Sequence, residues 1–379
     1  MSSNSAAAEA ERVLRICSAC MYCDGFCPVF PALAGKHQFA LADLSYLANL
    51  CHNCRGCYYA CQYAPPHPFA VNVPVSLAAV RRQSYAKYVW PRALGLAFHR
   101  PFYGAAIAAI VTLAIVLLMG AAEETRNSWF VAHAGTGAFY SVVPWELMAG
   151  MAAASFFWAI VSLTVSTLRF WRVIAPDVPR IVLRRALTST LWDILTLRHL
   201  RGGGFGCNDT DILLSQKRRV FHHVMAAGVL LDFVATAAAA FEQYALGAVP
   251  PYAYSSFPIC AGVGGGAAIL VGASGLLALE VRADRAPSER KEAALNAIFL
   301  MILMTVATSG LALLAFRETL AMSVLLVFHV SVVVGLFAAL PATKMLHAPY
   351  RAVALWRFVS ERLWRMSPLK HPDTTPDSE

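Results

Sequence analysis

Two runs of cysteines with the same internal spacing constrain this chain more than any other feature. Each run has the form C-x2-C-x2-C-x3-C, and together they hold eight of the ten cysteines of the chain. Zinc sites more often separate pairs of cysteines by a long gap, and the first 15 residues lack the apolar segment of a secretory signal that would favour disulfides. We therefore predict two [4Fe–4S] clusters, with zinc or a redox disulfide as the alternatives.

Pro28 follows the first run and completes a pattern in which the fourth cysteine of a run binds the cluster of the other run. Such crossed ligation makes the two runs one folding unit. The other two cysteines, Cys207 and Cys260, are interpreted as unligated thiols. The pattern assigns Cys17, Cys20, Cys23 and Cys61 to cluster I, and Cys51, Cys54, Cys57 and Cys27 to cluster II.

The segment between the two runs favours helix. Apolar residues from Phe39 to Leu50 recur three or four positions apart. We therefore expect residues 1–90 to form an α-helical, ferredoxin-like two-cluster domain rather than the small β-rich ferredoxin. The prolines that follow Cys61 predict an extended linker, which would run past Arg81 and Lys87 toward the rest of the chain.

The composition predicts a membrane protein, because 58% of the residues are hydrophobic and only 14% are charged. Six apolar runs are long enough to cross a bilayer as helices. The fold class is therefore all-α, with a six-helix transmembrane bundle in residues 91–366 and a disordered tail at 367–379. The six runs are 101–121, 144–170, 221–247, 259–281, 293–316 and 320–342.

Basic residues are distributed unevenly between the loops. They are concentrated in an amphipathic segment at 171–220 and in the loop at 282–292, whereas the other three loops contain only Arg126 and Arg317. Because Lys and Arg accumulate on the cytoplasmic side, we expect both termini and the cluster domain in the cytoplasm. The net charge of +9 follows mostly from this bias, so it does not indicate nucleic-acid binding.

Histidines at the cytoplasmic end of two predicted spans could bind haem. His222 and His223 begin the third span, and His347 lies just after the sixth, at a similar depth. Two imidazoles that face each other across a helix pair can supply both axial ligands of a b-type haem. Adjacent helical residues point about 100° apart, so only one of His222 and His223 can be the ligand. The alternative is that these histidines only contact lipid headgroups.

A second group of polar residues lies deeper in the predicted bundle. His329 and His347 are 18 residues apart, which predicts that both lie on one face of a single helix bent near Pro341. Asp232 lies at a depth similar to that of His329. Such a pair could carry protons, bind a quinone headgroup or only hold two helices together. His329 could also be one ligand of a second haem.

The chain resembles the family of tricarballylate and citrate utilisation B proteins. The matching stretches are the paired cysteine runs, GGGFGC at 202–207, KRRVFHH at 217–223, the Gly-rich fourth span, and the end of the sixth span with His329 and His347. That last span also resembles the haem-binding gamma subunit of respiratory nitrate reductases. The chain departs from the family pattern at Ala342-Thr343, where the family tends to have Tyr-Gly, and at Asp232.

The resemblance implies an electron-transfer subunit in a bacterial inner membrane. Its partner would be an FAD-dependent flavoprotein dehydrogenase that oxidises tricarballylate or a related carboxylate. Electrons would pass through two [4Fe–4S] clusters and one haem b to the quinone pool. The main alternative is a membrane iron–sulfur redox sensor. A carboxylate transporter is disfavoured, because no predicted span carries a central Lys or Arg.

Overall fold

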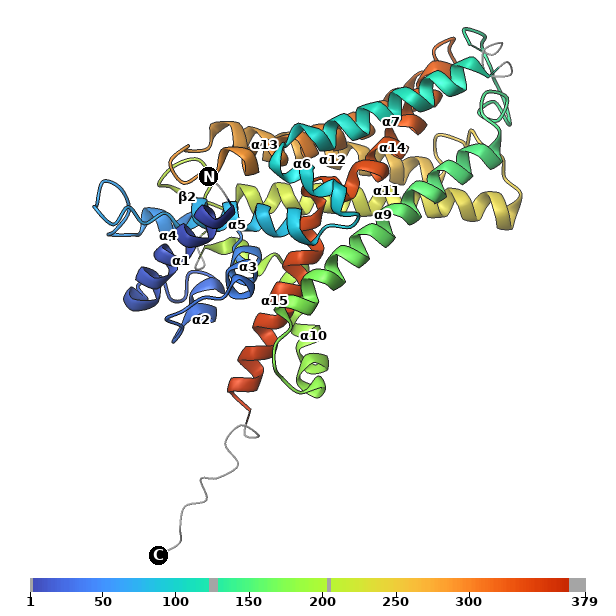
Figure 1. The fold of residues 1–379 in the computed structure, drawn as a ribbon. Coiled ribbons are helices and arrows are strands. Elements are labelled where there is room, and N and C mark those ends of the chain that lie inside the picture. Colours follow the sequence, from blue (N-terminus) through green and yellow to red (C-terminus); the bar gives the residue numbers. More distant parts are fainter. Residues whose placement is uncertain (1–2, 123–128, 203–205, 368–379) are drawn as a thin grey trace, which may run out of the picture.

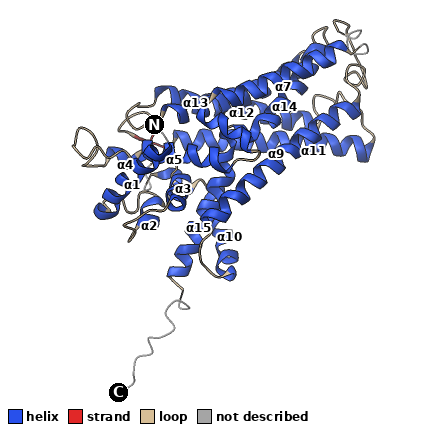
Figure 2. Ribbon diagram, in the orientation of Figure 1, coloured by secondary structure: helices blue, strands red, loops and turns tan. Residues whose placement is uncertain are grey.

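The computed structural model describes residues 3–122, 129–202 and 206–367, and helices dominate this part of the chain (Figures 1 and 2). The N-terminal domain is built from five helices, and a short connection leads from it to the long helices. The five are α1 (Ser3–Cys20), α2 (Val29–Leu33), α3 (Leu41–Leu50), α4 (Gly56–Tyr59) and α5 (Val73–Tyr88), and the connection contains η1 (Arg92–Gly95) and α6 (Leu96–His99).

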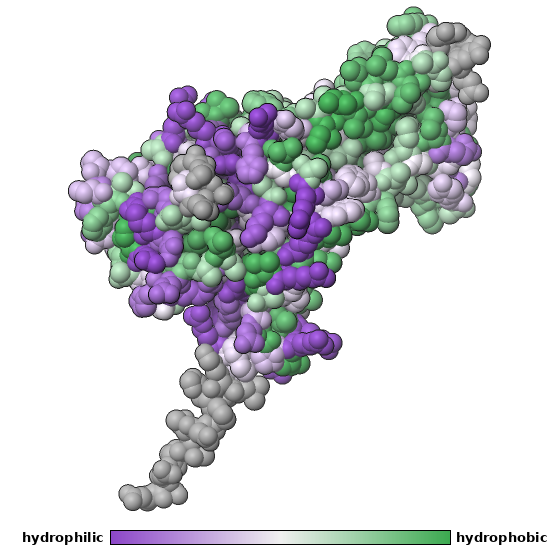
Figure 3. Space-filling view, viewed as in Figure 1, coloured by the Kyte–Doolittle hydropathy of each residue, from purple (hydrophilic) through white to green (hydrophobic). Residues whose placement is uncertain are grey.

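Six of the described helices are long and apolar enough to cross a membrane, which agrees with the number of predicted spans. Their apolar side chains cover much of the elongated part of the molecule, whereas polar residues gather around the N-terminal domain (Figure 3). The fold is therefore all-α, with a bundle compatible with a multi-pass membrane protein. The six are α7 (Phe102–Ala121), α9 (Trp145–Ile174), α11 (Lys217–Leu246), α12 (Phe257–Arg282), α13 (Arg290–Ala315) and α14 (Met322–Ala339), the last extended by η3 (Leu340–Ala342).

The basic segments lie at the same end of the bundle as the N-terminal domain (Figure 1). This end also contains α10 (Arg180–Leu195), η2 (Arg198–Arg201), α15 (His347–Arg365) and a small antiparallel hairpin of β1 (Cys207–Asn208) and β2 (Leu214–Ser215). At the opposite end, Arg317 donates to the Tyr252 carbonyl at 2.7 Å. This arrangement agrees with the charge asymmetry, and the direction of the bundle in a membrane stays a prediction.

The predicted extended linker is wrong for residues 73–88, which form helix α5. Pro74 lies in the first turn of that helix, where the missing N–H costs no hydrogen bond, and Asn72 caps the helix by accepting from the Val75 N–H. Helix α5 packs against the long helices: the Tyr85 ring contacts Tyr350 of α15 at 5.5 Å between centroids. The N-terminal domain is therefore docked on the bundle.

The prediction that His329 and His347 share one helix is also wrong. Helix α14 ends at Ala339, and Thr343 has extended backbone angles between η3 and η4 (Lys344–Leu346). Pro341 lies in η3, where its ring is incompatible with a continuous helix. His347 therefore begins a separate helix, α15.

Two further predictions concern the basic segment at 171–220 and the C-terminal tail. The segment at 171–220 is not one amphipathic element, because α9 continues to Ile174 and α11 begins at Lys217. Helix α10 lies between them and leaves Leu187, Leu191 and Leu195 exposed, as expected for a helix at a membrane surface. The tail at 368–379 lies outside the described residues.

Helices α11 and α12 approach each other through glycines. A Cβ on Gly272 would lie 2.7 Å from both the Phe221 carbonyl oxygen and the Met225 Cβ, and a Cβ on Gly228 would lie 2.7 Å from the Gly265 carbonyl oxygen. Small residues are the usual means by which helices in a bilayer come into close contact. This packing fixes the position of the N-terminal end of α11.

We predict that Gly272→Ala destabilises the protein in detergent by about 1–3 kcal/mol, because the added methyl group overpacks the α11–α12 contact. Gly150→Ala in α9 is the matched control, since a Cβ at Gly150 meets nothing within 4 Å. Both changes gain helix propensity, so equal melting temperatures for the two variants would contradict the packing argument.

Candidate functional site

The structure brings the proposed ligands of cluster I to one surface cavity, here called cavity I. It encloses about 400 Å³ of empty space, part of it open to solvent. Cys17 and Cys20 come from the last turn of α1, and Cys23 comes from the following turns. Cys61 lies just after α4 and lines the same cavity. All four sulfurs therefore belong to one site, although Cys61 is distant from the others in sequence.

The proposed ligands of cluster II line a second cavity, cavity II, with about 340 Å³ of empty space. Cys27, Cys51, Cys54 and Cys57 all lie along its wall. The loop that carries Cys54 turns sharply, because Asn53 and Arg55 both have positive φ angles of 55° and 64°. The grouping of the eight cysteines matches crossed ligation, and the ligation itself stays a prediction.

The two cavities adjoin and differ in burial. Cys57 lines both cavities. Cys20 of cavity I is exposed, whereas Cys51 and Cys54 of cavity II are each only 7% exposed. Burial, and then the neighbouring cysteines, raise the pKa of the Cys17 thiol to about 12. Cluster assembly must therefore displace protons from these thiols.

The donor set at each cavity fits an iron–sulfur cluster. Each cavity is lined by the four cysteines that the spacing assigns to one cluster. Four thiolates are the usual ligands of a [4Fe–4S] cluster. Four thiolates also bind zinc, which stays the alternative.

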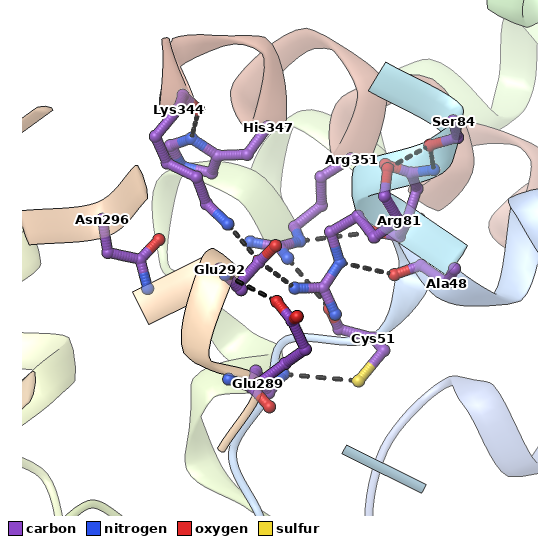
Figure 4. Close-up of polar contacts among 12 residues, drawn as sticks. Ala48, Cys51, Arg81, Ser84, Glu289, Glu292, Asn296, Lys344, His347 and Arg351 are labelled. Atoms are coloured by element: carbon purple, nitrogen blue, oxygen red, sulfur yellow. Dashed lines mark hydrogen bonds and ion pairs between the residues drawn. The ribbon is translucent and has the colours of Figure 1, made fainter. Parts of the chain in front are cut away.

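A network of buried charges joins the N-terminal domain to the long helices (Figure 4). Glu292, in the first turn of α13, accepts from Arg81 of α5 at 2.8 Å and also pairs with Lys344 of η4. Arg81 also donates to the Ala48 carbonyl at 2.7 Å. Burial lowers the pKa of Lys344 to about 8, although the charge of Glu292 acts in the opposite direction.

Arg351 extends this network from α15 to the second cysteine run. Its guanidinium donates to the Cys51 carbonyl at 2.9 Å and lies 3.4 Å from the Asn49 carbonyl (Figure 4). Burial, and then the charge of Arg81, lower the pKa of Arg351 to about 10. Arg351 is one helical turn from His347, so it links a predicted haem ligand to a predicted cluster ligand.

The two histidine candidates on α11 and α15 face each other. The His222 and His347 rings are 6.3 Å apart between centroids and nearly perpendicular, at 83°. His347 Nδ1 donates to the Lys344 carbonyl at 2.7 Å, which leaves Nε2 with a free lone pair. His222 Nδ1 is buried and has no hydrogen-bond partner among the described residues. His222 and His347 are therefore the residues that would hold a haem iron at this site.

His223 is directed elsewhere, since its Nε2 donates to the Leu195 carbonyl of α10 at 3.0 Å. The structure therefore brings His222, and not His223, to His347. The sequence left this choice open. The contact that decides it joins α11 to α10, which are separate elements in the sequence.

The predicted pair between Asp232 and His329 is not formed among the described residues. His329 Nδ1 instead lies 2.9 Å from the Ser309 hydroxyl of α13, and Gly310 leaves room for its ring. Asp232 lies against Gly265 of α12. The two residues therefore face different neighbouring helices.

The sequence predicts that Cys207 is an unligated thiol, and the structure places it beside Cys54 of cavity II. Cys207 is 1% exposed and packs with Cys54 and Leu200, and its thiol donates to the Leu200 carbonyl at 3.2 Å. The neighbouring Asn208 N–H donates to the Cys54 carbonyl at 3.0 Å. The β1–β2 hairpin thus covers the second cysteine run. The repeated spacing could not reveal this role, because Cys207 lies outside both runs.

Comparison with known proteins agrees with this architecture. A family profile described as "Citrate utilization protein B" matches residues 102–367, and one described as "Citrate utilization protein B Fer4-like domain" matches residues 10–87. The chain belongs to the citrate utilization protein B family. A family member from Escherichia coli, named Citrate utilization protein B, is 38% identical over 357 residues, which cover 94% of this chain and 92% of that protein. No solved structure matches. The Fer4-like domain of the citrate utilization protein B family indicates an iron–sulfur electron-transfer role.

We predict that Glu292→Gln destabilises the protein by about 3–5 kcal/mol, because it leaves Arg81 and Lys344 buried without a carboxylate. Glu289→Gln is the control. Its ion pair with Arg82 is longer, at 3.5 Å, and its side chain still caps α13 by accepting from the Glu292 N–H. Thermal unfolding in detergent measures both variants, and losses of equal size would contradict a central role for Glu292.

Proposed function

We propose that this chain is the membrane-anchored electron-transfer subunit of a flavoprotein dehydrogenase and delivers electrons to the quinone pool. The observation that carries the proposal is the succession of three sites. An open cavity lined by the four cysteines assigned to cluster I adjoins a buried one lined by the four assigned to cluster II, and Arg351 links the buried one to the His222–His347 pair. When bound, two [4Fe–4S] clusters and a haem b would each accept and release single electrons.

The surface beside cavity I suits contact with a soluble donor. Tyr22 lines the cavity and is 66% exposed, and Phe69 is 49% exposed. The Phe69 ring packs against Tyr63, which also lines the cavity, at 5.6 Å between centroids. Exposed aromatic residues are enriched where proteins bind each other. We therefore place the flavoprotein at the Tyr22–Phe69 surface, next to the exposed Cys20.

The partner is proposed to oxidise tricarballylate or a related tricarboxylate. The support is the family, since the relative from Escherichia coli carries citrate utilization in its name. The substrate need not contact this chain, because only electrons pass from the flavoprotein to it. A redox sensor would need cysteine clusters, but it would not need the His222–His347 pair at the end of the bundle. We therefore prefer the electron-transfer function to the sensor.

The quinone is proposed to accept electrons on the bundle side of the His222–His347 pair. Asp232 and His329 remain the candidate proton or headgroup residues, because both are ionisable groups within the apolar bundle. Since the structure pairs His329 with Ser309 and not with Asp232, the two residues are best changed one at a time.

We predict that His347→Ala removes the sharp bands of a reduced b-type haem from the optical spectrum but leaves the iron–sulfur clusters in place. About eight iron atoms should remain per chain if two clusters are bound. His222→Ala should have the same effect. His223→Ala is the matched control and should keep the bands, because His223 faces Leu195. Full haem content in His347→Ala would contradict the assigned ligand pair.

We predict that Tyr22→Asp slows the reduction of the clusters by the reduced flavoprotein about tenfold or more, because it puts a charge at the centre of the proposed contact. Leu41→Asp is the control, since Leu41 is similarly exposed, at 61%, and does not line cavity I. Rapid-mixing absorbance measures the rate, and dithionite should reduce both variants normally. Equal rates for the two variants would place the flavoprotein elsewhere.

A further inference from the structure

The two cavities differ in the charges that surround them. Three arginines donate to carbonyls of the segment 48–53, which leads into and through the second cysteine run. Arg81 donates to Ala48, Arg351 to Cys51, and Arg218 to Asn53 at 3.0 Å. A fourth, Arg55, belongs to the run itself, lines cavity II and is 1% exposed. Four guanidinium groups therefore lie close to the second cysteine run, and that of Arg55 belongs to a residue in the wall of cavity II.

Only two of these four arginines form an ion pair with a carboxylate. Arg81 pairs with Glu292, which it shares with Lys344, and Arg218 pairs with Asp209 at 3.1 Å.

Arg55 and Arg351 form no ion pair with a carboxylate in the described part of the chain. Arg55 donates only to the Asp209 backbone carbonyl, at 2.9 Å, and its buried Nε has no partner there. Arg351 donates only to the backbone carbonyls of Asn49 and Cys51. Burying a cation is costly unless an anion lies close by. An anion bound in cavity II would therefore stabilise both of these buried cations.

Cavity I has no comparable surplus of positive charge around it. The side chains that line it, apart from the cysteines, are apolar, aromatic or amide groups, and none is an arginine or a lysine. The nearby Arg12 and Arg15 of α1 lie at the surface and pair with Glu9 and Glu11 at 2.7 and 2.6 Å. The charges near cavity I are therefore balanced and largely exposed to water.

We propose that cluster II is the higher-potential cluster of the two, and that Arg55 and Arg351 raise its potential. A cluster held by four thiolates is an anion, and it gains one more negative charge when it accepts an electron. Buried cations beside it therefore stabilise the reduced form, and both net charge and hydrogen bonding are known to set the potentials of such clusters. The inference rests on the proposed function and adds to it the direction of electron transfer between the two clusters.

The direction follows from a balanced one-electron step. Cluster I, reduced by the flavin of the partner, loses one electron and is oxidised, and cluster II gains that electron and is reduced. The buried cations favour the state in which cluster II is reduced. The electron therefore moves from the exposed cavity toward the His222–His347 pair. Arg55 and Arg351 act here as tuning residues, since neither is a ligand.

The test is a redox titration of the full-length purified protein, followed by electron paramagnetic resonance. The wild type should show two one-electron steps. Arg351→Gln and Arg55→Gln should each lower only the higher step, by about tenfold in its equilibrium constant, which is 59 mV for one electron. Arg351→Lys keeps the charge and should restore most of the shift. Arg12→Gln is the control and should leave both steps unchanged.

Cys20→Ser assigns the steps, because it alters only the signal of cluster I. The inference is overturned if the two clusters titrate together, or if Arg351→Gln lowers the step that Cys20→Ser perturbs. In either case about eight irons per chain and two reducible clusters would leave the proposed function standing. A wild-type protein without reducible clusters would contradict the proposed function itself. If Arg351→Gln fails to assemble, Arg55→Gln and Arg351→Lys decide the matter.

Discussion

The buried carboxylate of Glu292 holds the two halves of this protein together. It pairs with Arg81 of the N-terminal domain and with Lys344 at the end of the last span, and it lies in the first turn of α13. A buried ion pair contributes little to stability by itself, because desolvation offsets its attraction. Here the network fixes the position of the N-terminal domain on the bundle. Any other docking would leave at least one of the three charges, on Glu292, Arg81 or Lys344, buried without a partner.

That docking decides where the functional groups lie. With α5 packed on the bundle, the second cysteine run faces α15, and Arg351 can reach the Cys51 carbonyl. The ring stack between Phe170 and Tyr350, at 4.5 Å between centroids, fixes α15 against α9 from the other side. The histidine pair is thus held by rigid helices, and the loop of the second cysteine run is fixed to α15 through the Cys51 carbonyl. Such anchoring suits sites that must stay at a constant distance from each other.

Much of this architecture follows from the sequence alone. The six spans follow from hydropathy, because a bilayer demands about 20 apolar residues per helix. The grouping of the eight cysteines follows from their spacing. The approach of one of His222 and His223 to His347 follows from their matched depth, although the sequence predicts His347 on the sixth span and the structure places it on α15.

The errors in the sequence analysis have physical causes. Prolines such as Pro74 were read as ending helices, although one in a first turn is tolerated. The break at Thr343 was read as a bend, because a sequence pattern does not show the backbone angles of one residue. Arg55 and Arg351 could not be identified, since their importance depends on carboxylates that are absent from around them in space. The spacing of residues along the chain does not show whether a carboxylate lies near these arginines in space.

The break between α14 and α15 has a consequence for how the protein matures. His222 lies near the start of a membrane-compatible helix, whereas His347 begins a helix that packs on the N-terminal domain and α10. His222 and His347 thus belong to parts of the chain that are positioned in different steps of assembly. One is set by insertion of the spans, and the other by docking of the domain that carries the cysteines. The pair is complete only when both have happened, so a chain with an unfolded N-terminal domain would not present a finished pair of ligands.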